Sequence, residues 1–389
     1  MMKQVYLDNA ATTMVHKEVI ETMDAYYGDL YGNPSSIYDF GQTAKKAINS
    51  ARETIASVIN AKADEIYFTG GGSESDNWAI KGVMAANRKK GNHIITSKIE
   101  HHAVLHTCEY LAKNGYEVTY LNVDSDGLIS LSELEEAIRE NTVLITIMFA
   151  NNEIGTIQPI KEIGDIAKRH GALFHTDAVQ AFGHVPIDVK EMNIDLLSSS
   201  AHKIHGPKGV GMLYIRKGIK IDNLIHGGAQ ESKKRAGTEN VPGICGYSKA
   251  AEMAMDSMNE RMSYVSGLRD RFLKKIPEAI ENVRLNGHPT KRLPGNVNFS
   301  FEFIEGESLL LYLDMEGISA SSGSACTSGA LDPSHVLMAI GLPHEIAHGS
   351  LRLSLSEFTT EEDVDYTIEK LIGVVHRLRL MSPLYIRRK

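Results

Sequence analysis

The stretch that decides the fold is a small polar turn between two apolar runs: Ser198-Ser199-Ser200-Ala201-His202-Lys203-Ile204-His205-Gly206-Pro207-Lys208-Gly209. The flanking runs, residues 194–197 and 210–215, are typical of buried strands. A lysine in such a turn, when partly desolvated, loses its proton and becomes a nucleophile toward an aldehyde. Most lysines are solvated instead, so this segment alone favours an exposed turn lysine. The case for Lys203 therefore depends on the rest of the chain.

The composition is that of a soluble globular protein. The 389 residues, 42% hydrophobic and 23% charged, suffice for a large core and two domains. The net charge of −8 argues against nucleic-acid binding, and we expect no membrane span and no signal peptide. Three widely spaced cysteines (Cys108, Cys245 and Cys326) do not make a disulfide framework, which fits a reducing cytoplasm. No metal-ligand motif occurs, so we expect no metal.

Predicted strands and helices alternate through the first part of the chain. We expect strands at 65–69, 93–96, 116–121, 143–149, 172–175, 194–197 and 210–215. Helices are expected at 42–60, 77–90, before 115, at 132–140 and at 160–170, the last stopping at Gly171. This alternation predicts an α/β fold with a largely parallel sheet. Beyond Arg216 we expect a long helical stretch at 243–275, which could bridge two domains, and then a smaller α+β domain.

A glycine-rich loop, residues 70–73, joins the first predicted strand of this series to a helix. Bare backbone amides, a hydroxyl and the positive helix end make such a loop an anion site. Ser73 with Asp76 resembles a capping arrangement, and Ser132 with Glu135 resembles another for helix 132–140. The loop matches neither the ATP-type P-loop nor the dinucleotide fingerprint. A tight turn without a ligand is an equally good interpretation.

Polar residues recur just after the predicted strands. Ligands of such sheets bind at the carboxyl ends of strands. That shared placement predicts one site built from Gly72, Ser73, His101, Asn152, Asp177, Gln180 and Lys203.

Pyridoxal phosphate is a ligand that would use this whole set. Its aldehyde needs a lysine, Lys203, and its ring nitrogen needs a carboxylate, Asp177, to stay protonated. His101 suits stacking on the ring. Gln180 and Asn152 would donate to the phenolic oxygen. The phosphate would be held by Gly72, Ser73, Ser200 and His202. Each residue alone is weak evidence, because an aspartate after a strand is more often a helix cap.

Two further residues stand out. Arg352 lies inside an apolar strand and needs a partner; a substrate carboxylate and an internal salt bridge are equally good candidates. Cys326 lies in the run Ser319 to Ala330, which is built almost entirely of small residues. An accessible thiol in such a run is typical of a nucleophile that must travel, and we favour that over a packing role. Cys108 and Cys245 are expected to be packing residues.

Together these motifs resemble the cysteine desulfurases of the nitrogen-fixation and iron–sulfur-cluster type, which belong to the class V aminotransferase group and PLP fold type I. Matching motifs run from residues 6–13 to 382–385, and the most specific are 200–209, 235–238 and 321–328. The resemblance implies a large PLP-binding domain over 14–260 with a mostly parallel seven-stranded sheet. It also implies a smaller α+β domain, formed by 1–13 and 261–389, that carries the catalytic cysteine loop at 319–332.

The same resemblance implies roles for single residues. Lys203 would be the Schiff-base lysine, Asp177 the partner of the pyridinium nitrogen, and His101 would stack on the ring and assist proton transfer. Arg352, with Asn33 and Asn152, would bind the substrate. Cys326 would attack the substrate sulfur. In this family Thr238 reaches the phosphate of the neighbouring subunit, which implies a homodimer.

The implied activity converts L-cysteine to L-alanine and leaves a persulfide on Cys326. An iron–sulfur scaffold or another acceptor protein then takes the sulfur. A selenocysteine lyase or an aminotransferase on the same cofactor is the first alternative, and a catalytically silent scaffold is the second. The chain departs from the family at Ser356-Glu357, where a glycine and often an arginine are common. Glu239-Asn240 and the short ending lean toward the nitrogen-fixation branch.

Overall fold

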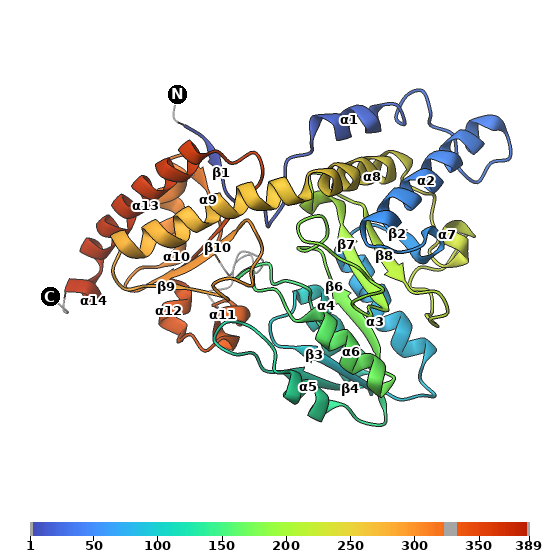
Figure 1. Ribbon diagram of the computed structural model, residues 1–389, viewed down its shortest axis with the longest axis horizontal. Helices are drawn as coiled ribbons and strands as arrows, with labels where there is room; N and C mark the ends of the chain where they lie inside the picture. The colour runs from blue at the N-terminus through green and yellow to red at the C-terminus, as the bar shows by residue number, and fades with distance from the viewer. Residues whose placement is uncertain (1–2, 323–332, 387–389) are drawn as a thin grey trace.

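The fold is built on a seven-stranded sheet (Figure 1). The structure is a computed structural model, and it describes residues 3–322 and 333–386. The strand order is β2-β8-β7-β6-β5-β3-β4. Strand β8 pairs antiparallel with both of its neighbours, and the other pairs are parallel. The bounds are β2 Ile66–Thr69, β3 His93–Ser97, β4 Glu117–Leu121, β5 Thr142–Thr146, β6 Leu173–Asp177, β7 Leu196–Ser200 and β8 Gly211–Ile215. The α/β fold predicted from the alternating pattern is confirmed.

Helices cover both faces of this sheet, which explains why its strands read as short continuous apolar runs. One face packs against α1 (Lys17–Asp24), α2 (Asp39–Val58), α5 (Leu131–Ala137), α6 (Ile160–His170) and α8 (Val241–Asp256). The other face packs against α3 (Gly72–Ala86) and α4 (His102–Lys113), with Trp78 and Cys108 fully buried there. As predicted, α6 ends at Gly171, whose φ of +68° a glycine adopts without strain.

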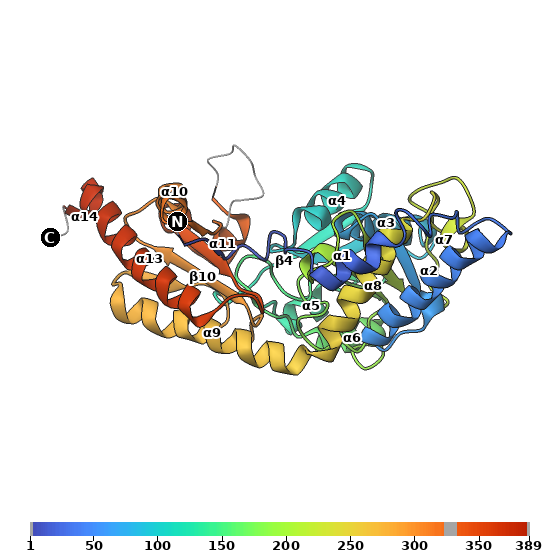
Figure 2. The same ribbon diagram turned by 90° about the horizontal axis from the view of Figure 1, so that it is seen from above.

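A second hydrophobic core lies around a smaller antiparallel sheet of order β12-β10-β9. Its strands are β9 Val283–Leu285, β10 Asn296–Phe301 and β12 Ser350–Ser354, and it packs against α9 (Met258–Ala279), α10 (Gly306–Met315) and α13 (Glu361–Met381). Figures 1 and 2 show α9 running from the larger sheet to the smaller one. The single helical stretch predicted at 243–275 is two helices, because Ser257 leaves the helical conformation between α8 and α9.

The N-terminal segment connects the two sheets. Strand β1 (Val5–Tyr6) pairs in parallel with β11 (Ile318–Ser319), and Asp8 then bridges to Ser354 of β12. Five residues further on, the Thr13 amide donates to the carbonyl of His202, 3.1 Å away. A segment that the sequence marks only as turn-like therefore crosses from the smaller sheet to the lysine turn.

Two predicted helix starts are wrong. Helix α3 begins at Gly72, not at residue 77, with Gly71 at its N-cap, so Ser73 lies in the first turn and does not cap it. Helix α5 is capped by Ser130, whose hydroxyl accepts from the Glu133 amide, and not by Ser132 with Glu135. In both cases the helix begins before the serine that the capping pattern selects.

The remaining elements are short: η1 Ala63–Glu65, η2 Ala201–Lys203, α7 Gln230–Lys233, α11 His335–Ala339, α12 His344–His348 and α14 Pro383–Ile386. Across residues 3–322 and 333–386, no helix has the length and apolar character needed to cross a bilayer.

Candidate active site

Lys203 lies directly behind the end of a central strand. Strand β7 ends at Ser200, and the single turn η2 brings the lysine around to the carboxyl edge of the sheet. Its ammonium group donates to two backbone carbonyls of the N-terminal segment, Ala10 at 2.6 Å and Ala11 at 2.7 Å. The Gln180 amide donates to the same Ala10 oxygen at 3.0 Å. Two residues predicted for one site therefore share one backbone acceptor.

The segment from Ala10 to Thr13 holds the lysine turn in place. The Thr13 hydroxyl donates to the His202 carbonyl at 3.0 Å and accepts from the His205 amide at 2.8 Å. His205 has a φ of +62°, so this turn is held in a left-handed conformation by those contacts. On the other side, the Ala10 amide donates to the Ser354 hydroxyl of β12 at 2.8 Å. Sequence reasoning missed this role because backbone carbonyls of small residues leave no pattern.

Three of the predicted phosphate residues, Gly72, Ser73 and Ser200, lie at the start of α3. An ideal Cβ on Gly72 would lie 2.6 Å from a methyl of Val179 and 3.8 Å from the Cβ of Ser200. Only a glycine fits there without displacing Val179, and the first-turn amides of α3 have no intrahelical acceptors. Ser73 is exposed in this turn, and His202 lies 3.2 Å from the Thr12 hydroxyl. The arrangement has the parts of an anion site: amides, hydroxyls and a helix N-terminus.

A salt bridge borders this anion site. Glu74, in the first turn of α3, accepts from the Gly70 amide at 2.8 Å and from the Arg235 guanidinium at 2.9 Å. Arg235 thereby offsets a carboxylate that would otherwise repel a phosphate. The contact also ties the loop that carries Thr238 to α3. Thr238 itself is exposed.

Asp177 ends strand β6 and is buried, with 6% of its surface exposed. One carboxylate oxygen accepts from the Val179 amide at 2.9 Å. Burial raises the pKa of Asp177, and the charges of His101 and Lys203, together with that amide, oppose the rise. The acid therefore lies within electrostatic range of both residues with which the sequence grouped it.

His101 is the N-cap of α4, and its Nδ1 accepts from the Ala103 amide at 3.2 Å. This contact fixes the tautomer, since an accepting Nδ1 leaves the proton on Nε2. The ring is half-buried at the edge of the site.

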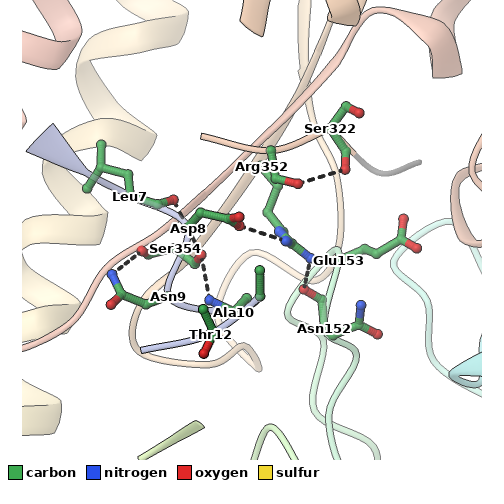
Figure 3. Close-up of polar contacts among 12 residues, drawn as sticks. Leu7, Asp8, Asn9, Ala10, Thr12, Asn152, Glu153, Ser322, Arg352 and Ser354 are labelled. Atoms are coloured by element: carbon green, nitrogen blue, oxygen red, sulfur yellow. Dashed lines mark hydrogen bonds and ion pairs between the residues drawn. The ribbon is translucent and has the colours of Figure 1, made fainter. Parts of the chain in front are cut away.

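Arg352 makes an internal salt bridge, one of the two partners that the sequence left open. Its guanidinium lies between Asp8, at 2.9 Å, and the backbone carbonyl of Asn152, at 3.1 Å (Figure 3). Only 4% of Arg352 is exposed, and its Nε has no hydrogen-bond partner within the described ranges.

Two predicted residues stand apart or outside. Asn33 lies in the loop between α1 and α2, which Figure 1 shows at the far end of the molecule from the smaller sheet that carries Arg352. Within one chain the two residues therefore do not meet. Cys326 lies outside the described residues. The segment leading to it is anchored by Ser321, which exchanges two backbone hydrogen bonds with Arg352, at 3.1 and 2.7 Å.

The sequence of this chain matches one family along most of its length. Residues 5–367 match the aminotransferase class-V family. This chain belongs to that family.

Relatives of this class-V chain include a protein named cysteine desulfurase IscS from Methanosarcina thermophila. It is 63% identical over 382 residues, which span 98% of this chain and 94% of the relative. A protein of the same name from Clostridium botulinum is 59% identical over 99% of this chain and 98% of its own length. Among solved structures, a NifS-like protein has a TM-score of 0.91 at 40% identity, covering 96% of this chain and all of that one. A structure titled SspA in complex with cysteine has a TM-score of 0.82, also at 40% identity, covering 92% of this chain and all of that one.

Class-V aminotransferases depend on pyridoxal phosphate, and the residues of this family member fit that group. A Cβ on Gly72 would fill the cradle beside Val179 and Ser200 where a phosphate is expected. Asp177 offers a buried carboxylate for a ring nitrogen, and Lys203 offers the amine for an aldehyde.

Proposed function

We propose that this chain is a pyridoxal-phosphate-dependent cysteine desulfurase, which converts L-cysteine to L-alanine and transfers the sulfur to an acceptor as a persulfide. The observation that carries the proposal is the pairing of Ser321 with Arg352. Because of this pairing, the segment that leads to Cys326 begins next to Arg352, a buried arginine that could bind an amino-acid carboxylate. Five residues of chain reach at most about 18 Å. This length of chain would let the Cys326 thiol reach a substrate bound at Arg352.

The cofactor would be held by residues at the carboxyl edge of the large sheet. Lys203 would bind its aldehyde, Asp177 would pair with its ring nitrogen and His101 would stack on its ring. Gln180 and Asn152 would contact the ring oxygen. The phosphate would be held by Gly72, Ser73, Ser200 and His202, with Thr238 of the neighbouring subunit. When bound, the cofactor supplies an electron sink for the charge that develops at the substrate Cα.

The chain's own residues have three roles in the proposed reaction: substrate binding, proton transfer and nucleophilic attack. Arg352, with Asn152 and a neighbouring subunit's Asn33, orients the substrate carboxylate. Lys203 Nζ removes the proton from Cα, and His101 assists proton transfer. The Cys326 thiolate attacks the substrate sulfur, so that an S–S bond forms as the Cβ–S bond breaks. The electron pair left on Cβ takes up a proton, and Lys203 Nζ returns a proton to Cα, which yields alanine.

The partners we propose follow from the exposed surface and the sequence. Large apolar side chains gather around the α1–α2 loop: Tyr27 is 65% exposed, Tyr31 71% and Ile37 94%. Exposed apolar clusters of this kind mark protein interfaces. They support a homodimer that brings Asn33 and Thr238 to the neighbouring site.

We propose an iron–sulfur scaffold or another acceptor protein as the sulfur recipient, and the cytoplasm as the compartment. The described cysteines, Cys108 and Cys245, are both free thiols.

We also propose that the chain divides into a large domain, 14–260, and a small one formed by 1–13 and 261–389. Two separate hydrophobic cores support this division. The break between α8 and α9 lies near the proposed boundary.

The test of the proposed function is a product assay on the purified protein. The wild type should be yellow and should form alanine and sulfide in equal amounts from L-cysteine with a thiol reductant. Cys326→Ala should stay yellow and form no sulfide, while Cys245→Ala serves as the matched control and should retain activity. Lys203→Ala should lose the visible band of the lysine-bound cofactor. Sulfide release that persists in Cys326→Ala, or a preference for selenocysteine or for amino-group transfer, would overturn the proposal.

A further inference from the structure

A second buried carboxyl group lies within electrostatic range of Asp177. Asp76, in the first two turns of α3, is 1% exposed, and the proposed reaction gives it no role. Its Oδ1 has no hydrogen-bond partner in the described part of the chain. A buried carboxylate without a compensating charge is among the least stable arrangements a protein can adopt. Its position therefore calls for a physical explanation.

The neighbours of Asp76 form a chain of polar side chains across three strands. Thr146 Oγ1 lies 2.8 Å from Nδ1 of His175, and His175 Nε2 lies 2.9 Å from the Ser198 hydroxyl. Ser198 in turn hydrogen-bonds Asp76. His175 Nε2 is also 3.7 Å from Asp76 Oδ1, a separation typical of an ion pair. Because burial lowers the pKa of His175 to about 3, the imidazole is neutral and gives Asp76 no positive charge.

The charges around Asp76 all favour its protonated form. Burial raises its pKa most, and the charge of Asp177 raises it further, as does that of Glu100; the Ser198 hydrogen bond opposes them. Glu100 is itself fully buried, and burial raises its pKa to about 8. The charge of Lys203 acts on Asp177 and lowers its pKa. Of these three buried acids, Asp177 is the one with a lysine cation close by.

We propose that Asp76 is a positioning residue: it lies near Asp177 as a neutral carboxylic acid, joined to His175 through Ser198, and so leaves the Asp177 carboxylate as the single negative charge under the cofactor ring. A neutral acid offers a proton to the Ser198–His175 chain and adds no second charge. If Asp76 were ionised, the pocket would hold two negative charges, and the pKa of the ring nitrogen that pairs with Asp177 would change. This inference rests on the proposed function only for the role of Asp177.

The direct test is infrared spectroscopy of the holoenzyme at neutral pH. The carbonyl-stretching region of protonated acids should hold one band that disappears in Asp76→Asn and a second that disappears in Glu100→Gln. Asp195→Asn is the matched control, since Asp195 is a buried acid paired with Arg216 at 3.3 Å, and neither band should change in it. A spectrum that Asp76→Asn leaves unchanged would overturn the proposal. This reading needs no turnover, so it stands apart from any failure of the desulfurase assay.

A second readout is the pH titration of the visible cofactor band. Asn is neutral like the proposed acid, so Asp76→Asn should shift the midpoint by less than about 0.3 unit. Removing a true negative charge would shift it by about one unit or more, which would contradict the proposal. If Asp76→Asn does not fold, Ser198→Ala replaces it in the infrared test. The Asp76 band should then shift because the acid loses the serine hydroxyl to which its O–H donates, and an unmoved band would overturn the inference.

Discussion

The guanidinium of Arg352 and the carboxylate of Asp8 form an ion pair 2.9 Å long across 344 residues of sequence (Figure 3). Asp8 belongs to the N-terminal segment and Arg352 to the middle of β12, so the pair joins two ends of the chain. Arg352 is therefore already paired with a carboxylate. In the proposed function, the substrate carboxylate would replace Asp8 on the guanidinium.

We predict that Asp8→Asn strengthens substrate binding and weakens the fold. Without its internal competitor, Arg352 should bind L-cysteine with a KM roughly 3- to 10-fold lower, because an uncompensated buried charge gains more from a new partner. The free energy of unfolding should fall by about 1–3 kcal/mol for the same reason. Steady-state kinetics and urea titration measure the two effects. Arg352→Gln is the paired control and should raise KM; an unchanged KM in Asp8→Asn would refute the exchange.

The cradle at Gly72 gives a steric prediction. Gly72→Ala should reduce cofactor affinity about 10-fold, since the new methyl would lie 2.6 Å from Val179 and must push that side chain aside. Equilibrium dialysis against pyridoxal phosphate measures this. The double variant Gly72→Ala/Val179→Ala should recover most of the affinity. Gly267→Ala, at a helical position with open space around it, should bind the cofactor like the wild type.

The Thr13 hydroxyl should position Lys203 indirectly, because it hydrogen-bonds the residues around the lysine and not the lysine itself. Thr13→Val keeps the shape and removes both side-chain hydrogen bonds to the lysine turn, at His202 and His205. We expect a loss of about 1–3 kcal/mol of stability from the unsatisfied backbone groups, and a fall in kcat of at least about 10-fold from a displaced amine. Thermal unfolding and turnover report each effect. Thr13→Ser keeps the hydroxyl and should behave like the wild type; equal losses in both variants would contradict this explanation.

Glu357 gives a prediction about acid stability. Its carboxylate lies 3.2 Å from His205 Nε2 and 3.9 Å from Arg261. Burial raises the pKa of Glu357, but the hydrogen bond and charge of His205, with the charge of Arg261, outweigh it and lower the pKa to about 2. A lowered folded-state pKa adds stability above the unfolded value of 4.5, and that stability is lost as the pH falls toward 2.

Glu357→Gln should therefore be less stable than the wild type by about 1–2 kcal/mol at pH 7, after allowance for its partial exposure. The difference should shrink steadily between pH 5 and pH 3. Guanidinium titrations at a series of pH values measure it. Glu345→Gln, on the short helix α12, is the control and should show no pH-dependent difference. A gap that stays constant down to pH 3 would rule out the ion pairs as its origin.

Much of the fold could be predicted because local patterns carry it. The apolar strands of the large sheet and the helical spacing of α2 and α6 are properties of neighbouring residues. Polar residues behind those strands predicted which edge holds the site. The capping patterns failed at Ser73 and Ser132 because a serine and an acid three residues apart also occur inside a helix's first turn.

The contacts that set the site's chemistry could not be predicted in this way. Ala10 and Ala11 meet Lys203 across about 190 residues, and they do so through backbone oxygens that no side-chain pattern reports. In the sequence Asp76 reads as part of a capping pattern with Ser73, and only the packing of α3 over β6 and β7 buries it near Asp177.

Periodicity and short motifs act within a few residues, so they were enough to predict the layered α/β architecture, the lysine turn and the polar residues at the strand ends. The tertiary structure alone decided which charges face one another: Asp8 with Arg352, Glu357 with His205, and Asp76 near Asp177. These pairings depend on burial and on distances between segments far apart in the chain. Burial removes these acids from water, so that their charges act strongly on the neighbouring groups.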